Sequence, residues 1–194
     1  DIPDSALLFL NLSKRLGKDG DYIADIEIKR LAGYIKYAWV KNTPYFKQIM
    51  IDGTDLTGFE PNCNGYFGKF YNSGYVFEKN EIRSNFFLAL CVACETMKRH
   101  GDKYIEENKR FFELLQYLSR EYYKIGTMGS FEPGDEGCCL TGETDLSDPG
   151  LVISFSILYN STRNKEFLRA AKIIADNMID KYYRFGLFNG YGKD

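Results

Sequence analysis

The stretch LYNSTRNKEFLRAA, residues 158–171, contains the end of one helix, a short polar turn and the start of a second helix. The segment before the turn is apolar on most sides, whereas the segment after it repeats apolar residues with a helical period. The same order occurs twice earlier, with basic residues at 14–15 and 98–99 in the turns. The helix end YYKIG at 122–126 is also echoed by YYRFG at 182–186. The chain therefore repeats a two-helix unit.

Helical periodicity extends through most of the chain. We predict six helices, over residues 5–16, 21–40, 81–99, 103–123, 147–160 and 165–183. Asp4 or Ser5 is expected to cap the first helix, and Gly17 and Gly101 are expected to end the first and third. Pro149 falls in the first turn of the fifth helix, where proline is tolerated.

The alternation of helix types predicts the layers of the fold. The leading helix of each pair is apolar on most sides and should be buried, while the following helix is amphipathic and should face solvent on one side. The prediction is one all-α domain over residues 1–194, built from antiparallel helical hairpins in two layers. Two segments, at about 41–79 and 126–148, are too long to be simple connections and are candidates for function.

This series of hairpins resembles the α/α toroid, or six-hairpin glycosidase-like, superfamily. The turn at 158–171 and the closing GLFNGY at 186–191 are similar to that superfamily's hairpin turn and strand-like return loop. The resemblance is architectural, and it implies an enzyme that acts on carbohydrate. Only three hairpins are present, so we also consider an incomplete toroid, which would expose an apolar face at one end.

Composition excludes several classes of function. The 194 residues hold 25 Lys and Arg against 27 Asp and Glu, a net charge of -2, which provides no basic surface for nucleic acid or an anionic membrane. No apolar run approaches the ~20 residues that span a bilayer. His100 is the single histidine, which excludes most histidine-based triads and multi-histidine metal sites. No signal peptide is evident, although a secreted or periplasmic location is favoured if the protein acts on carbohydrate.

The first long segment, at about 41–79, interleaves aromatic residues with glycine. Exposed aromatic faces stack on the apolar faces of sugar rings, so Tyr66 and Tyr71, with the nearby Trp39, are candidate substrate-binding residues. Asp55 lies in the same segment and is a candidate acid or base. The alternative is that these aromatic side chains simply pack the segment onto the helices.

The second long segment, at about 126–148, is acidic, and no Lys or Arg occurs between Lys124 and Arg163. Crowded carboxylates are stabilised by a cation or by protonation of one member, which creates a general acid. Glycosidic hydrolysis uses one protonated and one ionised carboxyl group. The alternative is a solvated loop in which Asp148 caps the fifth helix. The candidate catalytic residues, together with Asp55, are Asp135, Glu136, Glu143 and Asp145.

Five cysteines do not define a disulfide framework. Cys91 and Cys94 share one helical face and are expected to pack in the core. The pair Cys138–Cys139 lies in the acidic segment and partly resembles the zinc-binding pair of a β-L-arabinofuranosidase-type toroid family. No cofactor is expected, with zinc or calcium in the acidic segment kept as an alternative.

Two classes of function follow from these features. The first is a carbohydrate-active enzyme, either a glycoside hydrolase that uses the loop carboxylates or a polysaccharide lyase that needs a tyrosine or histidine base and a group that neutralises charge. The partner in both is an oligosaccharide or polysaccharide. The second is a non-catalytic helical-repeat module that binds a glycan or a protein. The oligomeric state is left open by the sequence.

Overall fold

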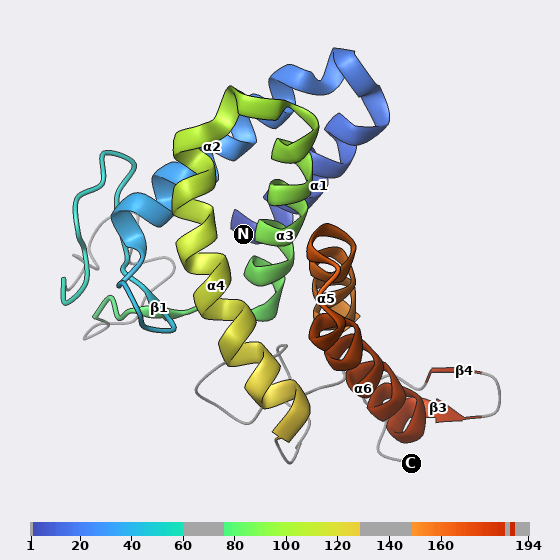
Figure 1. Ribbon diagram of the computed structural model, residues 1–194. Coiled ribbons are helices and arrows are strands. Elements are labelled where there is room, and N and C mark those ends of the chain that lie inside the picture. The colour runs from blue at the N-terminus through green and yellow to red at the C-terminus, as the bar shows by residue number, and fades with distance from the viewer. Residues whose placement is uncertain (1, 60–75, 129–148, 185–186, 189–194) are drawn as a thin grey trace.

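The computed structural model describes residues 2–59, 76–128, 149–184 and 187–188, and these form a mostly helical protein (Figure 1). The α-helices in this part of the chain are α1 (Ile2–Leu16), α2 (Asp21–Ala38), α3 (Ser84–Arg99), α4 (Ile105–Met128), α5 (Pro149–Thr162) and α6 (Lys165–Tyr182). Short 3-10 turns, Gly17–Gly20 and Gly101–Tyr104, connect the first two pairs. The predicted all-α class is confirmed.

The helices pack as three hairpins in two layers. Each helix packs against its partner in the hairpin, α1 on α2, α3 on α4 and α5 on α6. One layer contains α1, α3 and α5, with α3 between the other two, and the second layer contains α2, α4 and α6 in the same order. Because the connection within each hairpin is short, its two helices run antiparallel. The predicted hairpins and layers are therefore present.

A residue with left-handed backbone conformation stands at the turn of each hairpin. Gly17 and Gly101 have φ of 60° and 58°, so both predicted glycine helix ends are confirmed. In the third turn Arg163 takes the same conformation, with φ of 57°. Asn164 then caps α6, because its side chain accepts a hydrogen bond of 3.0 Å from the backbone N–H of Glu166.

The centre of the core is α3, which contacts both neighbours in its layer. The Phe87 ring stacks on Tyr122 of α4 at 5.3 Å between centroids and meets the edge of Phe155 of α5 at 5.7 Å. Cys91, on the same helix, is fully buried and Cys94 is partly buried. Burial raises the pKa of the Cys94 thiol to about 12, so it stays protonated at neutral pH.

The starts of the first and third helices differ most from the predictions. The first helix begins at Ile2, so the expectation that Asp4 or Ser5 caps it is wrong, and both residues lie inside its first turns. The third helix begins at Ser84 rather than 81, because Asn80–Glu81 forms strand β2. This strand pairs antiparallel with β1 (Tyr45–Phe46), and backbone hydrogen bonds compete successfully there with helix formation. Tyr45–Phe46 belongs to the long segment predicted at about 41–79.

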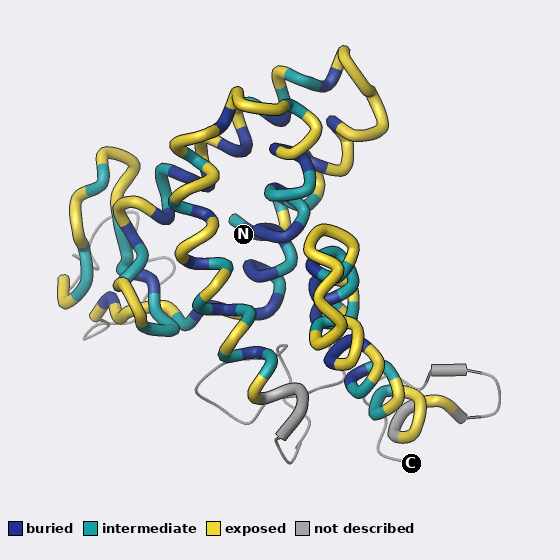
Figure 2. The backbone as a smooth tube through the Cα atoms, in the orientation of Figure 1, coloured by how far each residue is buried: buried dark blue, intermediate teal, exposed yellow. Residues whose placement is uncertain are grey.

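The prediction that every leading helix is buried is wrong for α1. Its buried positions include Ala6 and Leu10, but four large apolar residues on its other side are 38–65% exposed, and these are Leu8, Phe9, Leu12 and Leu16. The exposure has a simple cause, since among the described helices of its layer α1 packs closely against α3 and not against α5. Figure 2 shows the contrast in burial along the chain.

The end of the described chain is strand-like, as expected. Strands β3 (Tyr183–Arg184) and β4 (Leu187–Phe188) pair antiparallel after α6. The acidic segment is shorter than predicted, because α4 continues to Met128. None of the helices in the described part of the chain is both long enough and apolar enough to cross a bilayer.

Candidate functional site

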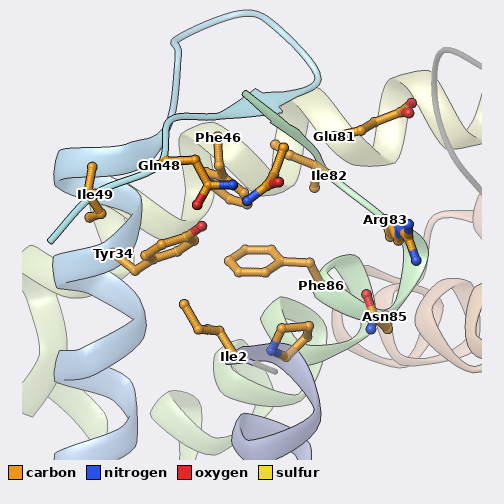
Figure 3. A pocket seen from close by; sticks show the side chains of 12 residues that line it. Ile2, Tyr34, Phe46, Gln48, Ile49, Glu81, Ile82, Arg83, Asn85 and Phe86 are labelled. Atoms are coloured by element: carbon orange, nitrogen blue, oxygen red, sulfur yellow. The ribbon is translucent and has the colours of Figure 1, made fainter. Parts of the chain in front are cut away.

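A cavity of about 570 Å³ lies where the first turns of α1 and α3 meet α2 and the β1–β2 strands (Figure 3). Its position follows from the fold, because the two helix starts converge beside the short sheet. The lining combines apolar and polar side chains. The residues are Ile2, Pro3, Tyr34, Phe46, Gln48, Ile49, Asn80, Glu81, Ile82, Arg83, Asn85 and Phe86.

One wall of the pocket is a cluster of three aromatic rings. The Phe46 ring lies 4.8 Å from Tyr34 and 4.7 Å from Phe86, measured between centroids. Phe46 and Phe86 are each 3% exposed, so the cluster is continuous with the core. Tilted ring pairs of this kind hold one another in place. The wall is therefore rigid and apolar.

The Tyr34 hydroxyl brings a polar group to this wall. Burial raises the pKa of Tyr34, so the phenol is protonated at neutral pH and can donate a hydrogen bond. Figure 3 shows its oxygen on the same side of the pocket as the Gln48 carboxamide. Among the described residues, neither the Tyr34 hydroxyl nor the Gln48 side chain has a hydrogen-bond partner. Both are suited to bind the hydroxyl groups of a ligand.

The start of α3 contributes positive electrostatic potential to the pocket. Arg83 is the N-cap residue, and its carbonyl accepts the backbone N–H groups of Phe86 and Phe87 at 3.0 and 3.3 Å. The first N–H groups of a helix and its dipole both favour an anion. Glu81 lies on the same rim, but its carboxylate points away from the aromatic rings (Figure 3). Arg83 and the start of α3 thus bring positive charge to one side of the pocket.

Asp55, predicted as an acid or base, lies on an exposed turn outside this pocket. Its carboxylate pairs with Lys47 at 2.9 Å and accepts the backbone N–H of Thr57 at 2.9 Å. The Lys47 ammonium, followed by the Thr57 hydrogen bonds, lowers the pKa of Asp55 to about 2. Asp55 is therefore ionised at neutral pH and cannot donate a proton there.

Trp39, predicted to stack on sugar, is the C-cap residue of α2. Its indole N–H donates to the carbonyl of Thr43 at 3.1 Å, and its ring lies 6.2 Å from Tyr117 of α4. The side chain is half-buried by these contacts. The other predicted site residues lie outside the described residues, and they are Tyr66, Tyr71, Asp135, Glu136, Glu143 and Asp145.

The remaining predicted features lie mostly away from the pocket. His100 ends α3, 3.8 Å from Asp21 and edge-on to Tyr104, which is a structural position. Within the described ranges, no group of three or more acidic, histidine or cysteine side chains could hold a metal ion. The pair Cys138–Cys139 and the cap residue Asp148 fall in the part that is not described.

Sequence reasoning did not select Tyr34, Gln48 or Arg83. Tyr34 lies within an amphipathic helix and looks like a packing residue, while Arg83 precedes an apolar helix. The available signal was the three polar residues Asn80, Glu81 and Arg83 just before that helix, since polar residues before a buried helix mark its accessible end. Only the fold shows that these positions face one cavity.

A family model described as periplasmic pectate lyase matches residues 2–192 of the chain. The chain belongs to this family. The match supports the polysaccharide-lyase branch of the carbohydrate-active prediction, and with it a polysaccharide partner. The family's description also agrees with the secreted or periplasmic location favoured by the sequence analysis.

Proposed function

We propose that the protein takes part in eliminative cleavage of a pectate-type polysaccharide, and that the pocket between α1, α2 and α3 binds a uronate unit of that chain. The observation that carries the proposal is the composition of the pocket in a chain of this family. It places Arg83 and the start of α3 on one side, and the neutral Tyr34 hydroxyl and Gln48 on the other.

Elimination has defined requirements. A base removes the proton on the carbon next to the uronate carboxylate, the electron pair forms a carbon–carbon double bond, and the bond to the leaving glycosidic oxygen breaks. Negative charge builds on the carboxylate in the transition state, so a fixed cation beside it accelerates the reaction. We assign that position to the Arg83 guanidinium, which can bind a carboxylate through two hydrogen bonds.

Tyr34 has the other polar role in this proposal. Its raised pKa keeps the phenol protonated, which suits a donor to a sugar oxygen rather than a base. The aromatic wall formed by Tyr34, Phe46 and Phe86 provides an apolar surface for the face of a sugar ring. The loop carboxylates and Tyr66 and Tyr71 stay predictions, as does zinc or calcium in the acidic segment.

The same proposal includes the architecture. We infer that the three hairpins are arranged as part of an α/α-toroid-like ring, which is supported by the repeated order of layers. The exposed apolar side of α1 is the kind of surface that an adjacent hairpin covers in such a ring.

Titration calorimetry with de-esterified oligogalacturonides tests the binding site. Arg83→Met should weaken binding by about ten- to a hundred-fold, which corresponds to a lost charge-assisted hydrogen bond. Tyr34→Phe should weaken it by about three- to ten-fold. Arg169→Met is the matched control, because Arg169 is an exposed arginine on α6 that does not line the pocket.

Cleavage is followed in parallel by the ultraviolet absorbance of the unsaturated product. Product formation that disappears in Arg83→Met but persists in Arg169→Met supports the elimination site. Binding without product would favour the alternative of a non-catalytic module that holds a glycan. Wild-type protein that neither binds nor cleaves any acidic oligosaccharide would overturn the proposal.

A further inference from the structure

The start of α1, which forms part of the pocket wall, is hydrogen-bonded to Arg30 of α2, and Arg30 is paired with the buried Glu27. Glu27 and Arg30 are three residues apart on α2, on the side that faces α1, and Tyr34 follows one turn later. The Glu27 side chain is 4% exposed. Its two carboxylate oxygens accept hydrogen bonds from the Arg30 Nε at 3.0 and 3.1 Å, and one of them also accepts from Nη2.

The same guanidinium reaches the first turn of α1. Arg30 Nη2 donates to the backbone carbonyl of Ile2 at 3.1 Å and to the Ser5 hydroxyl oxygen at 2.7 Å. Ser5 in turn donates to the Ile2 carbonyl at 3.0 Å. Ile2 and the adjacent Pro3 line the pocket. A short chain of polar contacts thus connects buried Glu27 with the pocket wall.

A second contact holds this turn from the other side. The Asp4 carboxylate lies 3.5 Å from the side-chain nitrogen of Asn85, a pocket residue in the first turn of α3. The start of α1 is therefore held between α2 and α3. Without such contacts the terminal turn of a helix frays, because its first N–H groups have no helical partners.

Stability alone is a weak reason to bury Glu27. Removing the Glu27 carboxylate from water has a cost that its attraction to Arg30, whose side chain is 38% exposed, at best offsets, so an apolar residue of similar size would stabilise α2 at least as well. An ion pair does what an apolar pair cannot, because it fixes direction through several hydrogen bonds. Here the fixed direction is that of the Arg30 guanidinium toward the Ile2 carbonyl.

We propose that Arg30, oriented by Glu27, is a positioning residue that sets the α1 wall of the pocket and so the affinity for ligand. The proposal rests on the proposed function, because it takes the ligand to be an acidic oligosaccharide. Neither residue lines the pocket, and the effect on the ligand is exerted through Ile2 and Ser5.

Ser5→Ala is the sharpest test, because it removes one link without leaving a buried charge unpaired. The affinity for an oligogalacturonide should fall by about three- to ten-fold, the effect of one lost hydrogen bond. Amide hydrogen exchange at residues 6–10, in the following turns of α1, should become faster while exchange in α3 is unchanged. Ser5→Thr keeps the hydroxyl, so its affinity for the oligogalacturonide and its amide exchange at residues 6–10 should match those of the wild type.

Two further variants complete the experiment. Arg30→Lys keeps the charge but has one nitrogen in place of the fork, so it should reproduce both effects of Ser5→Ala. Ser119→Ala is the control, because Ser119 makes the same kind of serine-to-carbonyl bond on α4 and does not line the pocket. If Arg30→Lys does not fold, the variants Ser5→Ala and Ser5→Thr are sufficient to test the positioning role.

The outcomes separate this proposal from the proposed function. Unchanged affinity in Ser5→Ala, with faster exchange in α1, means that the contacts only stabilise the helix and overturns the positioning role. Unchanged exchange overturns the anchor itself. Wild-type protein that binds no oligogalacturonide overturns the proposed function, and the positioning of ligand falls with it, whereas the exchange data still decide whether Arg30 anchors α1.

Discussion

The helices α1 and α3 have similar sequence patterns but different surroundings. Both lead a hairpin, both are apolar, and both end at a glycine with a left-handed conformation. α3 lies between α1 and α5, whereas in the described part of the chain α1 packs closely against one helix of its layer, α3. As a result Leu90 of α3 is fully buried and Leu12 of α1 is 38% exposed. The number of neighbours, rather than the helix sequence, decides how much of an apolar helix is covered.

The largest expected effect comes from shortening the same side chain at the two positions. Leu90→Ala should lower the free energy of unfolding by about 2–5 kcal/mol, because it leaves a cavity among buried groups. Leu12→Ala should cost under about 1 kcal/mol, since solvent already reaches that side chain. Urea denaturation followed by circular dichroism measures both values.

A third leucine provides the control for this pair. Leu10 lies on the buried side of α1 and is 0% exposed. Leu10→Ala should therefore resemble Leu90→Ala and not Leu12→Ala. Equal losses at Leu10 and Leu12 would show that the two sides of α1 are covered alike in solution, which contradicts the contrast drawn from the structure.

Ion pairs around Asp25 join α2 to the turn that precedes α4. They predict a smaller, pH-dependent effect on the stability of the fold. Asp25 of α2 accepts hydrogen bonds from Lys29 at 2.8 Å and Lys103 at 3.1 Å, and from the Tyr104 hydroxyl at 3.3 Å. The bonds from Lys29 and then Lys103 lower the pKa of Asp25 from 3.8 to about 2. The folded state thus favours the ionised carboxylate.

The sign of the pH effect follows from linkage. Because the folded pKa lies below the unfolded value, Asp25 stabilises the fold above pH ~4, and this contribution disappears as the pH falls toward about 2. Asp25→Asn should cost under about 1 kcal/mol near neutral pH, since such pairs are screened by solvent. Thermal denaturation of both proteins from neutral to acidic pH measures the difference. A difference that stays constant down to the lowest pH would contradict the lowered pKa.

The smallest effect on stability should come from making the exposed side of α1 polar. Leu8→Gln combined with Leu12→Gln should change the free energy of unfolding by under about 1 kcal/mol, because both side chains are already partly in water. The same variant should bind less of a fluorescent hydrophobic dye than the wild type, because its exposed apolar patch is smaller. Unaltered dye binding would mean that the patch is covered in solution.

Much of the fold was predictable because helical periodicity is a local property. Six helical segments, the glycine ends at Gly17 and Gly101 and the order of layers all follow from spacing along the chain. The helix starts were less predictable. At Asn80–Glu81 pairing with β1, a contact across more than thirty residues of sequence, replaces the expected helix.

The candidate site was not predictable in the same way. Tyr34, Gln48 and Arg83 belong to separate segments and share no motif, so nothing in their spacing indicates a common cavity. Trp39 stays a predicted platform for sugar, and the structure adds that its indole N–H donates to the Thr43 carbonyl. Asp55 stays a predicted acid or base, and its pairing with Lys47, which keeps it ionised at neutral pH, is a contact that only the structure shows.

The sequence by itself determined the helices and their pairing into hairpins, because both depend on residues close together along the chain. The tertiary structure alone decided which apolar side of α1 is covered and which polar side chains meet at the pocket. Burial and distance are set when separate segments pack, so the raised pKa of Tyr34 and the reach of Arg30 to Ile2 have no counterpart in the linear sequence.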